Sequence, residues 1–429
     1  MVESMCDKPH TQHWVDIDIN DYDYPLPDER IAAHPLADRD QCQLLLSDAT
    51  GRLEDHTFAE LPQLLPPHAL LIRNNTRVIK ARIFFVKATG ARIEILCLDP
   101  YKPVSYEESL ASLGSCSWHC LVGNSKKWRP EQTISCTLPL AGGQTITLQA
   151  SREAEMPDVV TFSWSDESKT FGEILELCGQ LPIPPYLNRE TESSDLTDYQ
   201  TVYARIEGSV AAPTAGLHFT PELDDRLLAE GHRITELTLH VGAGTFLPVK
   251  GRQVADHQMH SEYCSVPTAT LETLLEHIDS PFVPIGTTSV RTLESLYWFA
   301  VALQQAEPEG GEVAEPFHLD QWYSYRMRQS CGATLPSRRE ALELLLRYAR
   351  HKGLDRLTFS TALLIAPGYH YQMVDILVTN FHQPKSTLLL LVSALIGPHW
   401  RTLYEHALAD AHYRFLSYGD ACLLYRQDL

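Results

Sequence analysis

The sequence predicts an α/β protein made of a domain with a partly parallel sheet, a β-rich segment beside it and a helical insertion. From about residue 170 onward, short apolar strands alternate with helical periodicity, which is typical of α/β domains. From about 67 to 165, short runs of alternating apolar and polar residues are separated by glycine turns, which favours a small barrel or sandwich. The stretch 307–357 holds a loop and one long helical pattern, and is interpreted as a helical insertion.

The elements of the α/β part carry recognisable boundary signals. In the insertion, Ser337 is an N-cap, Glu340 occupies the capping-box position and Gly353 ends the helix. The apolar run at 388–397 is too short to span a bilayer and predicts a buried helix. Helices are expected at 168–180, 221–231, 268–278 and 291–306, and strands at 233–241, 281–286 and 373–380.

Three junctions share one construction, in which a hydroxyl-rich loop leads into a capped helix. The run SVAAPTAGLHFT (209–220) has no charged residue and precedes a helix that Thr220 can cap. The strand at 281–286 leads to a helix capped by Thr287 or Thr288, and the strand at 373–380 to one capped by Ser386. Ligands bind at this edge of open α/β sheets, and free N–H groups at helix starts suit a carboxylate or phosphate.

Two further segments contain candidate histidines. His240 ends a strand and precedes Gly242 and Gly244, whose spacing is not a dinucleotide fingerprint. These glycines permit either close approach of a ligand or tight packing. His260 and Glu262 lie two residues apart, so they would share a face on a strand. They form either an acid/base unit or a hydrogen-bonded pair that orders the loop, and the sequence favours the second. His218 is either structural or catalytic.

Composition and charge narrow the class of protein. The chain has 429 residues, 44% hydrophobic and 21% charged, which is typical of a globular enzyme with two or three domains. We see no secretory signal, and ten irregularly spaced cysteines indicate a reducing, cytoplasmic compartment. The cluster Cys116, His119 and Cys120 lacks a second Cys/His pair and fits a strand, so we expect no metal.

The charged residues are unevenly distributed along the sequence. A net charge of −20 argues against nucleic acid, yet residues 61–93 contain no Asp or Glu. This window and the segment NSKKWRP (124–130) form either a solvated strand face or a face that binds a polyanion. The basic residues that we assign to the second alternative are Arg73, Arg77, Lys80, Lys126, Lys127 and Arg129.

A family resemblance rests on motifs in a fixed order. SVAAPTAGLHFT, HVGAGTF, MHSE, GTTSVRTLES, PGY, TNFH with PKSTL, and YRFLSYGDA resemble the S-adenosylmethionine:tRNA ribosyltransferase-isomerase family of queuosine biosynthesis, as do LPDERIAAHPLADRD and NNTRVIKAR. The resemblance covers most of residues 20–425. It implies a mixed-sheet α/β catalytic domain (1–78 and 166–429) with an inserted small β-barrel domain (79–165) and the helical insertion at 307–357.

The resemblance also implies a reaction. Family members transfer and isomerise the ribosyl moiety of S-adenosylmethionine onto 7-aminomethyl-7-deazaguanine at the tRNA wobble position, giving epoxyqueuosine-tRNA, adenine and methionine. S-adenosylmethionine is then a substrate, no prosthetic group is needed, and tRNA is the partner. The candidate catalytic residues are His218, His240, His260, Glu262 and Lys385, and the candidate substrate-binding residues are Thr214, Gly216, Gly242, Gly244, Thr245, Thr288, Ser289, Arg291, Asn380 and His382.

Two alternatives stay open because the sequence departs from usual family residues at Gln43, Lys80, Leu247 and Gln383. One is a divergent enzyme that uses S-adenosylmethionine with a different acceptor. The other is a non-catalytic RNA-binding paralogue, although the retained hydroxyl and glycine loops argue against it.

Overall fold

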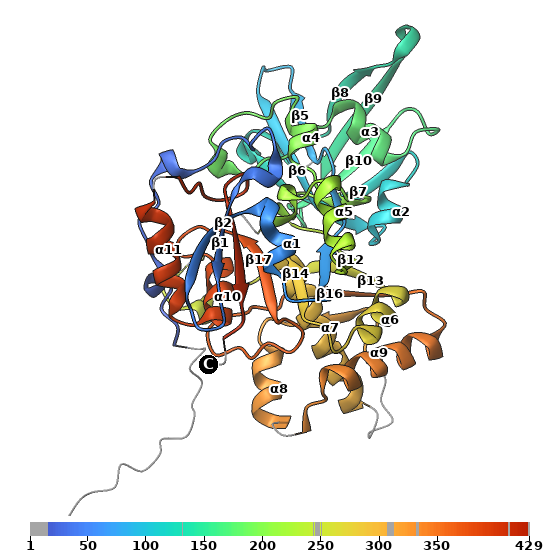
Figure 1. Cartoon of the computed structure of the whole chain (residues 1–429). Helices are drawn as coiled ribbons and strands as arrows, with labels where there is room; N and C mark the ends of the chain where they lie inside the picture. The colour runs from blue at the N-terminus through green and yellow to red at the C-terminus, as the bar shows by residue number, and fades with distance from the viewer. Residues whose placement is uncertain are drawn as a thin grey trace, which may run out of the picture. The chain divides into compact units, whose positions relative to one another are not determined.

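The computed structural model describes residues 16–130, 132–242, 244, 249, 251–306, 313–331, 334–410 and 412–427. The chain divides into two compact units (Figure 1). The first unit comprises Met1–Asn74, Thr214–Leu239 and Leu247–Leu429, and the second Asn75–Pro213 and His240–Phe246. The sequence predicts a barrel domain at 79–165, and these limits stay a prediction. The compact second unit extends beyond both of them.

A ten-stranded mixed sheet organises the first unit. Its strand order is β15-β16-β13-β12-β3-β14-β17-β18-β1-β2. The neighbours β12, β3, β14 and β17 are mutually parallel, as the alternation of strands and helices predicts. The strands are β1 (Gln43–Ser47), β2 (Leu53–Thr57), β3 (Leu70–Asn74), β12 (Arg233–Leu239), β13 (Glu262–Pro267), β14 (Phe282–Ile285), β15 (Phe317–Leu319), β16 (Arg356–Thr361), β17 (Ile376–Asn380) and β18 (Ala421–Tyr425).

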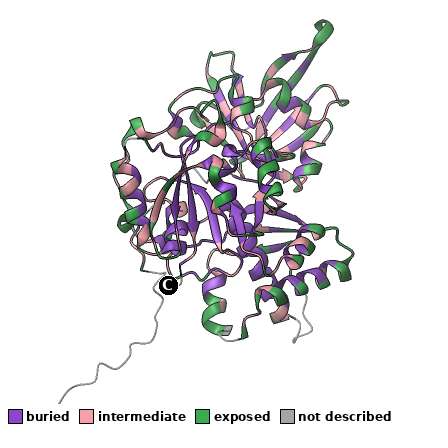
Figure 2. Cartoon of the chain, in the orientation of Figure 1, coloured by how far each residue is buried: buried purple, intermediate pink, exposed green. Residues whose placement is uncertain are grey.

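Helices cover this sheet. The longest described one, α7 (Gly286–Ala306), packs against β3, β12, β14 and β17. Figure 2 shows the central strands of this sheet in the buried colour, and every residue of β14 and β17 is buried, in keeping with their apolar sequences. The other helices are α1 (Leu61–Leu64), α5 (Pro221–Ala229), α6 (Thr268–Glu276), α8 (Tyr323–Cys331), α9 (Arg338–Lys352), α10 (Thr387–Ile396) and α11 (His399–Ala409), with 3-10 turns η1 (Ile19–Tyr22), η2 (Asp28–Arg30), η3 (Arg39–Gln41), η4 (Phe58–Glu60), η8 (Thr214–His218) and η10 (Val254–Asp256).

Local capping signals specify several helix starts. The Thr220 side chain accepts from Leu223 N at the start of α5, and Ser386 accepts from Leu389 N at α10, so both predicted caps are confirmed. The capping box of Ser337 and Glu340 in α9 is also confirmed, as is Gly353 at its C-cap. The prediction for Thr287 or Thr288 was wrong, because α7 already begins at Gly286 and both threonines lie within it.

Two other predictions concern burial and the insertion. Within α10, every residue from Leu389 to Ile396 is buried, as the apolar run predicts. Among the described residues, no helix combines the length and apolarity needed to cross a membrane. The segment 307–357 contains α8 and α9, but also β15, which pairs in parallel with β16. A three-residue strand carries too little periodicity to be seen in the sequence.

The second unit is built on a six-stranded antiparallel sheet. Its order is β5-β6-β7-β10-β9-β8, and the outer strands β5 and β8 contact each other, so the sheet is barrel-like and nearly closed. Its elements are β4 (Thr76–Val78), β5 (Arg82–Val86), β6 (Arg92–Lys102), β7 (Ser115–Gly123), β8 (Ile134–Pro139), β9 (Thr145–Arg152), β10 (Val159–Trp164), β11 (Ile206–Ser209), α2 (Tyr106–Leu110), α3 (Phe171–Cys178), α4 (Asp195–Asp198), η5 (Ser125–Lys127), η6 (Ala141–Gly143) and η7 (Pro185–Leu187).

Replacing Gly179 by alanine is expected to destabilise the second unit. Gly179 follows α3, and a Cβ there would overlap the backbone oxygens of Lys80 and Leu175. Overpacking against backbone costs about 1–3 kcal/mol. The control is Gly172→Ala within α3, where the nearest atom, Leu110 O, is 3.5 Å from the added Cβ. We expect Gly179→Ala to lower the urea midpoint, whereas Gly172→Ala leaves it unchanged or raises it; equal midpoints for both variants would contradict the packing described.

Candidate functional site

The carboxyl ends of four neighbouring parallel strands meet at one edge of the large sheet. β12, β3, β14 and β17 end at Leu239, Asn74, Ile285 and Asn380. Because parallel strands present the same end on the same side, these last residues lie next to one another. This edge belongs to the first unit and is where the sequence places its three strand–loop–helix junctions.

Asn74 connects three segments at this edge. Its Nδ2 donates to Leu239 O at 2.9 Å and to Thr288 Oγ1 at 3.3 Å, and its Oδ1 accepts from Leu239 N at 3.1 Å. The side chain is fully buried. Asn74 therefore fixes the end of β12 and the first turn of α7 relative to β3. The sequence analysis did not select it as a site residue, although an asparagine that directly follows the apolar run LLIR was an available signal.

His218 lies at the same edge, in a buried polar cluster. Asn380 Nδ2 donates to its Nε2 at 3.0 Å, and its Nδ1 lies 3.3 Å from Cys42 Sγ. Because Nε2 accepts, the neutral ring carries its proton on Nδ1. Burial, together with the positive charges of Arg414 and Arg39, lowers the pKa of His218 to about 3. This environment makes His218 a structural partner of Asn380 first and a weak base second.

One acceptor in this cluster has no protein partner. Asn380 Nδ2 also donates to Leu416 O at 3.1 Å, which fixes the orientation of the amide. Within the described part of the chain, Asn380 Oδ1 is buried without a hydrogen-bond partner. A buried acceptor left unpaired costs free energy unless a ligand or water satisfies it. Asn380 is therefore the predicted binding residue for which the geometry gives the clearest support.

The 3-10 turn η8 packs directly on the start of α7. Gly286 has φ +82°, and a Cβ there would lie 3.5 Å from the Ala215 Cβ. Gly216 in η8 is buried and Thr214 is half-buried. Ser289 Oγ donates to Ile285 O at 2.8 Å, so this hydroxyl joins α7 to the last residue of β14. The structure thus brings Thr214, Gly216, Thr288 and Ser289 into neighbouring elements.

Arg291 and Glu262 form a buried ion pair. Arg291 on α7 donates to the Glu262 carboxylate at the start of β13, and its Nε donates to Leu363 O at 3.2 Å. The guanidinium that the sequence offers for a substrate carboxylate is therefore already paired with a protein carboxylate. His260 precedes β13 and is exposed. His260 and Glu262 accordingly differ in environment: one faces solvent, and the other anchors the strand.

The loop after β17 holds the remaining predicted residues of the first unit. His382 Nε2 lies 2.9 Å from Thr379 Oγ1, and the backbone N–H of His382 donates to Tyr404 Oη at 2.8 Å. Burial lowers the pKa of His382 to about 3. Lys385 has φ +54° and forms an ion pair with Asp23 at 2.8 Å. Both side chains are thus held by contacts within the unit.

His240 belongs to the second unit, in a network of hydroxyl groups. Its Nδ1 lies 3.0 Å from Thr76 Oγ1, which lies 2.7 Å from Ser209 Oγ. The Tyr106 ring packs on it, with centroids 4.2 Å apart, and burial lowers the pKa of His240 to about 3. Gly242 and Gly244 are half-buried, and Thr245 lies outside the described residues.

The candidate tRNA-binding residues fall into two groups. Arg73, in the first unit, is neutralised by Asp224 at 2.6 Å and Glu236 at 3.0 Å. In the second unit, Arg77 lies 3.8 Å from Glu207 and Lys80 lies 2.9 Å from Glu176. In contrast, Lys126, Lys127 and Arg129 are exposed, and none of them forms an ion pair with any described residue.

Trp128 anchors this exposed basic segment. Its ring is buried, its Nε1 donates to Gln132 O at 2.6 Å, and the Arg152 guanidinium lies 5.4 Å from the ring centroid. Lys87 Nζ donates to Lys127 O at 2.6 Å. The backbone that carries the three cations is therefore fixed from inside while their charges remain in solvent.

The segment that contains Cys116, His119 and Cys120 is a strand, as the alternation of its residues predicts. In β7, Cys116 and Cys120 are buried, whereas His119 lies on the other face and pairs with Asp158 at 2.8 Å. Across the described residues, no group of three or more His, Cys, Asp or Glu side chains is arranged to hold a metal ion.

Fold and site together define a mixed-sheet α/β protein with a buried polar edge and a separate barrel-like unit that carries exposed cations. The family model described as "Queuosine biosynthesis protein" matches residues 19–424. The S-adenosylmethionine:tRNA ribosyltransferase-isomerase of Dechloromonas aromatica is 39% identical over 411 residues, which are 95% of this chain and 97% of that protein. The protein of the same name from Trichlorobacter lovleyi is 36% identical over 95% of this chain and 99% of its own length.

Among solved structures, the S-adenosylmethionine tRNA ribosyltransferase of Thermotoga maritima is 26% identical and covers 94% of this chain and 99% of its own, with a TM-score of 0.43. The family match and the curated relatives decide the classification. The chain belongs to the S-adenosylmethionine:tRNA ribosyltransferase-isomerase family of queuosine biosynthesis and is an enzyme.

The buried histidines predict a pH dependence of stability. The fold holds His218, His240 and His382 with pKa values of about 3, while an unfolded histidine titrates near pH 6.5. The unfolded chain therefore binds more protons below pH 6.5, so each group lowers the free energy of unfolding by up to about 1.4 kcal/mol per pH unit as the pH falls.

We expect the thermal midpoint to fall between pH 7 and pH 5, and to fall less steeply in His218→Gln. The control is His351→Gln, at an exposed position on α9, which should keep the wild-type slope. Identical slopes for wild type, His218→Gln and His351→Gln would contradict a neutral, buried His218.

Proposed function

We propose that the protein transfers and isomerises the ribosyl moiety of S-adenosylmethionine onto 7-aminomethyl-7-deazaguanine at the tRNA wobble position. The products are epoxyqueuosine-tRNA, adenine and methionine. At the site, the proposal rests on one observation: a chain of this family has a buried polar edge at Asn74, Thr288 and Asn380. A deazaguanine acceptor in tRNA goes beyond what the names of the relatives state.

Polar groups at this edge fit a cationic, hydrogen-bonding donor substrate. Asn380 Oδ1 is an acceptor that no described residue satisfies, and Thr214 and Thr288 add hydroxyl groups from η8 and α7. A sulfonium carries a positive charge, so these uncharged groups can approach it without repulsion, and the adenine amino group needs an acceptor. The proposed binding set is Thr214, Gly216, Thr288, Ser289 and Asn380.

A base is needed to remove a proton from the carbon next to the sulfonium. An efficient general base has a pKa near the working pH, whereas burial lowers the pKa of His218 and of His240 to about 3. His260 is exposed and lies two residues before Glu262, which Arg291 holds in place. We therefore favour His260 among the three candidate histidines, with Glu262 and Arg291 as positioning residues.

Adenine release from S-adenosylmethionine tests the function and the base together. Release is expected to require tRNA carrying 7-aminomethyl-7-deazaguanine. His260→Ala should lower kcat by roughly 10²–10⁴-fold, the usual contribution of a general base, without lowering the thermal midpoint. The matched control, His351→Ala, should leave kcat unchanged because that exposed histidine lies on α9.

The outcomes separate the alternatives. Release that does not depend on the modified base indicates a different acceptor, and no release with any tRNA indicates an RNA-binding paralogue. A wild-type rate in His260→Ala removes His260 as the base while leaving the reaction itself in place.

The exposed segment around η5 is the proposed contact with tRNA phosphates. Lys126, Lys127 and Arg129 form no ion pair with any residue that the structure describes, and counterion release on binding phosphate makes affinity depend on salt. The double reversal Lys126→Glu/Lys127→Glu should weaken tRNA binding and reduce the slope of log K against log salt by roughly 2. Binding of S-adenosylmethionine should not change.

Fluorescence anisotropy with labelled tRNA at several salt concentrations measures both quantities. The control is Arg339→Glu/Arg350→Glu on α9, which changes the net charge by the same amount at two exposed residues. An equal loss of affinity in both double variants would mean that only net charge matters, and the assignment to η5 would be wrong.

A further inference from the structure

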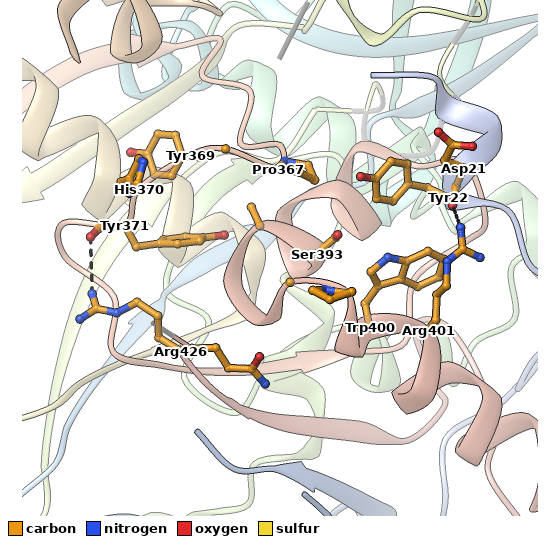
Figure 3. Close-up of a pocket in the computed structure, with 15 residues that line it drawn as sticks. Asp21, Tyr22, Pro367, Tyr369, His370, Tyr371, Ser393, Trp400, Arg401 and Arg426 are labelled. Carbon is orange, nitrogen blue, oxygen red and sulfur yellow. Dashed lines mark hydrogen bonds between the residues drawn. The ribbon is translucent and has the colours of Figure 1, made fainter. Parts of the chain in front are cut away.

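A cavity of about 750 Å³ lies in the first unit. On its η1 side it adjoins the candidate residue Lys385, whose backbone N donates to Tyr22 O at 2.9 Å, whereas its other end lies away from Asn380. It is lined by η1, the 367–371 loop, the segment from the end of α10 into α11, and the residues after β18 (Figure 3). Arg426 N donates to Asp375 O, so this region adjoins the beginning of β17, whereas Asn380 is at its end. At roughly 3.3 Å per residue, the strand alone separates the two places by about 13 Å.

Aromatic rings form two walls of the cavity. Tyr22 and Trp400 are stacked, with centroids 5.6 Å apart, and the Arg401 guanidinium lies 4.6 Å from the Trp400 ring. Figure 3 shows Tyr369 and Tyr371 on the opposite side.

The tyrosine wall is held rigidly. Tyr369 Oη donates to Glu294 at 2.7 Å, and the same carboxylate accepts from the backbone N of Met373 at 2.8 Å. Tyr371 Oη donates to Leu391 O at 2.7 Å. Because both hydroxyl groups are bonded within the protein, the tyrosines contribute their ring surfaces to a preformed site.

The polar groups at one end are donors with excess positive charge. Asp375 forms a bidentate pair with Arg338 at 2.8 Å, so Arg426, 3.7 Å from the same carboxylate, shares an already neutralised partner. Gln427 also lines the cavity; its side chain is 8% exposed, and its Nε2 has no hydrogen-bond partner among the described residues. At the other end, Arg401 donates to the backbone oxygen of Asp21, and both residues line the cavity. The charge of Arg426 is only partly neutralised, and Arg426 precedes Gln427, whose amide donor no described residue satisfies.

We propose that this cavity is a second binding site that takes a nucleotide unit, with its phosphate at Arg426 and Gln427 and its base between the aromatic walls. Guanidinium groups bind phosphate through paired N–H donors, and aromatic rings bind bases of any sequence. The volume falls in the range of small-molecule sites. The nucleotide is either free or part of the bound RNA, and the site does not depend on the proposed reaction.

Isothermal titration of the full-length protein with AMP, with S-adenosylmethionine at saturation, tests the site. Arg426→Leu removes the charge, and Gln427→Leu removes only the unpaired amide, so the second variant is expected to fold normally. Both should weaken AMP binding at least 10-fold, whereas the control Arg350→Leu, on the exposed face of α9, should not. Adenosine, which lacks the phosphate, should bind more weakly than AMP to the wild type.

Binding of tRNA distinguishes the two sources. If AMP does not bind, but both variants weaken tRNA binding at least 10-fold, the occupant is a nucleotide of the RNA. If AMP and tRNA bind both variants as they bind the wild type, or if AMP does not bind and tRNA affinity is unchanged, the proposal is overturned. Because turnover is measured separately, a failed reaction assay and a failed site are told apart.

Discussion

The structure of the first unit depends on how one buried amide, Asn74, is satisfied. Its side chain joins the end of β12 to the first turn of α7 through Leu239 and Thr288. Removing such a group leaves several buried partners unpaired, which costs more than the net worth of each bond. These bonds fix the carboxyl edge of the sheet, where Asn380 presents an oxygen that no described residue satisfies.

The same burial decides which histidines can do chemistry. His218 and His382 are enclosed by hydrogen-bonding neighbours, and their low pKa values follow from loss of hydration. Such imidazoles specify one packing arrangement, because only the neutral form fits. Our proposal places the base at His260, which is exposed in the loop before β13. It thus distinguishes the candidate histidines by solvent access rather than by residue type.

What the sequence predicted was local, and what it missed was long-range. The caps at Thr220 and Ser386 depend on residues three positions apart, so the local sequence is enough to predict them. The parallel sheet follows from the alternation of strands and helices. The ion-pair partners of Arg73 and Arg291 come from segments distant in the sequence, so the local pattern of charged residues could not predict them. The cavity was missed for the same reason, since residues 21–22, 367–371, 393–401 and 426–427 form it together.

An acidic enzyme that acts on tRNA must separate its useful cations from its carboxylates. With 35 basic and 55 acidic residues, most arginines and lysines can find a partner, and Arg73, Arg77 and Lys80 do so. Each neutralised cation contributes little to phosphate binding, because it would have to give up one partner for another. We therefore propose that phosphate binding uses the exposed cations on either side of the buried Trp128, which form no ion pair with any described residue. On this proposal, the net charge of −20 limits nonspecific attraction to RNA, so that binding depends on this surface.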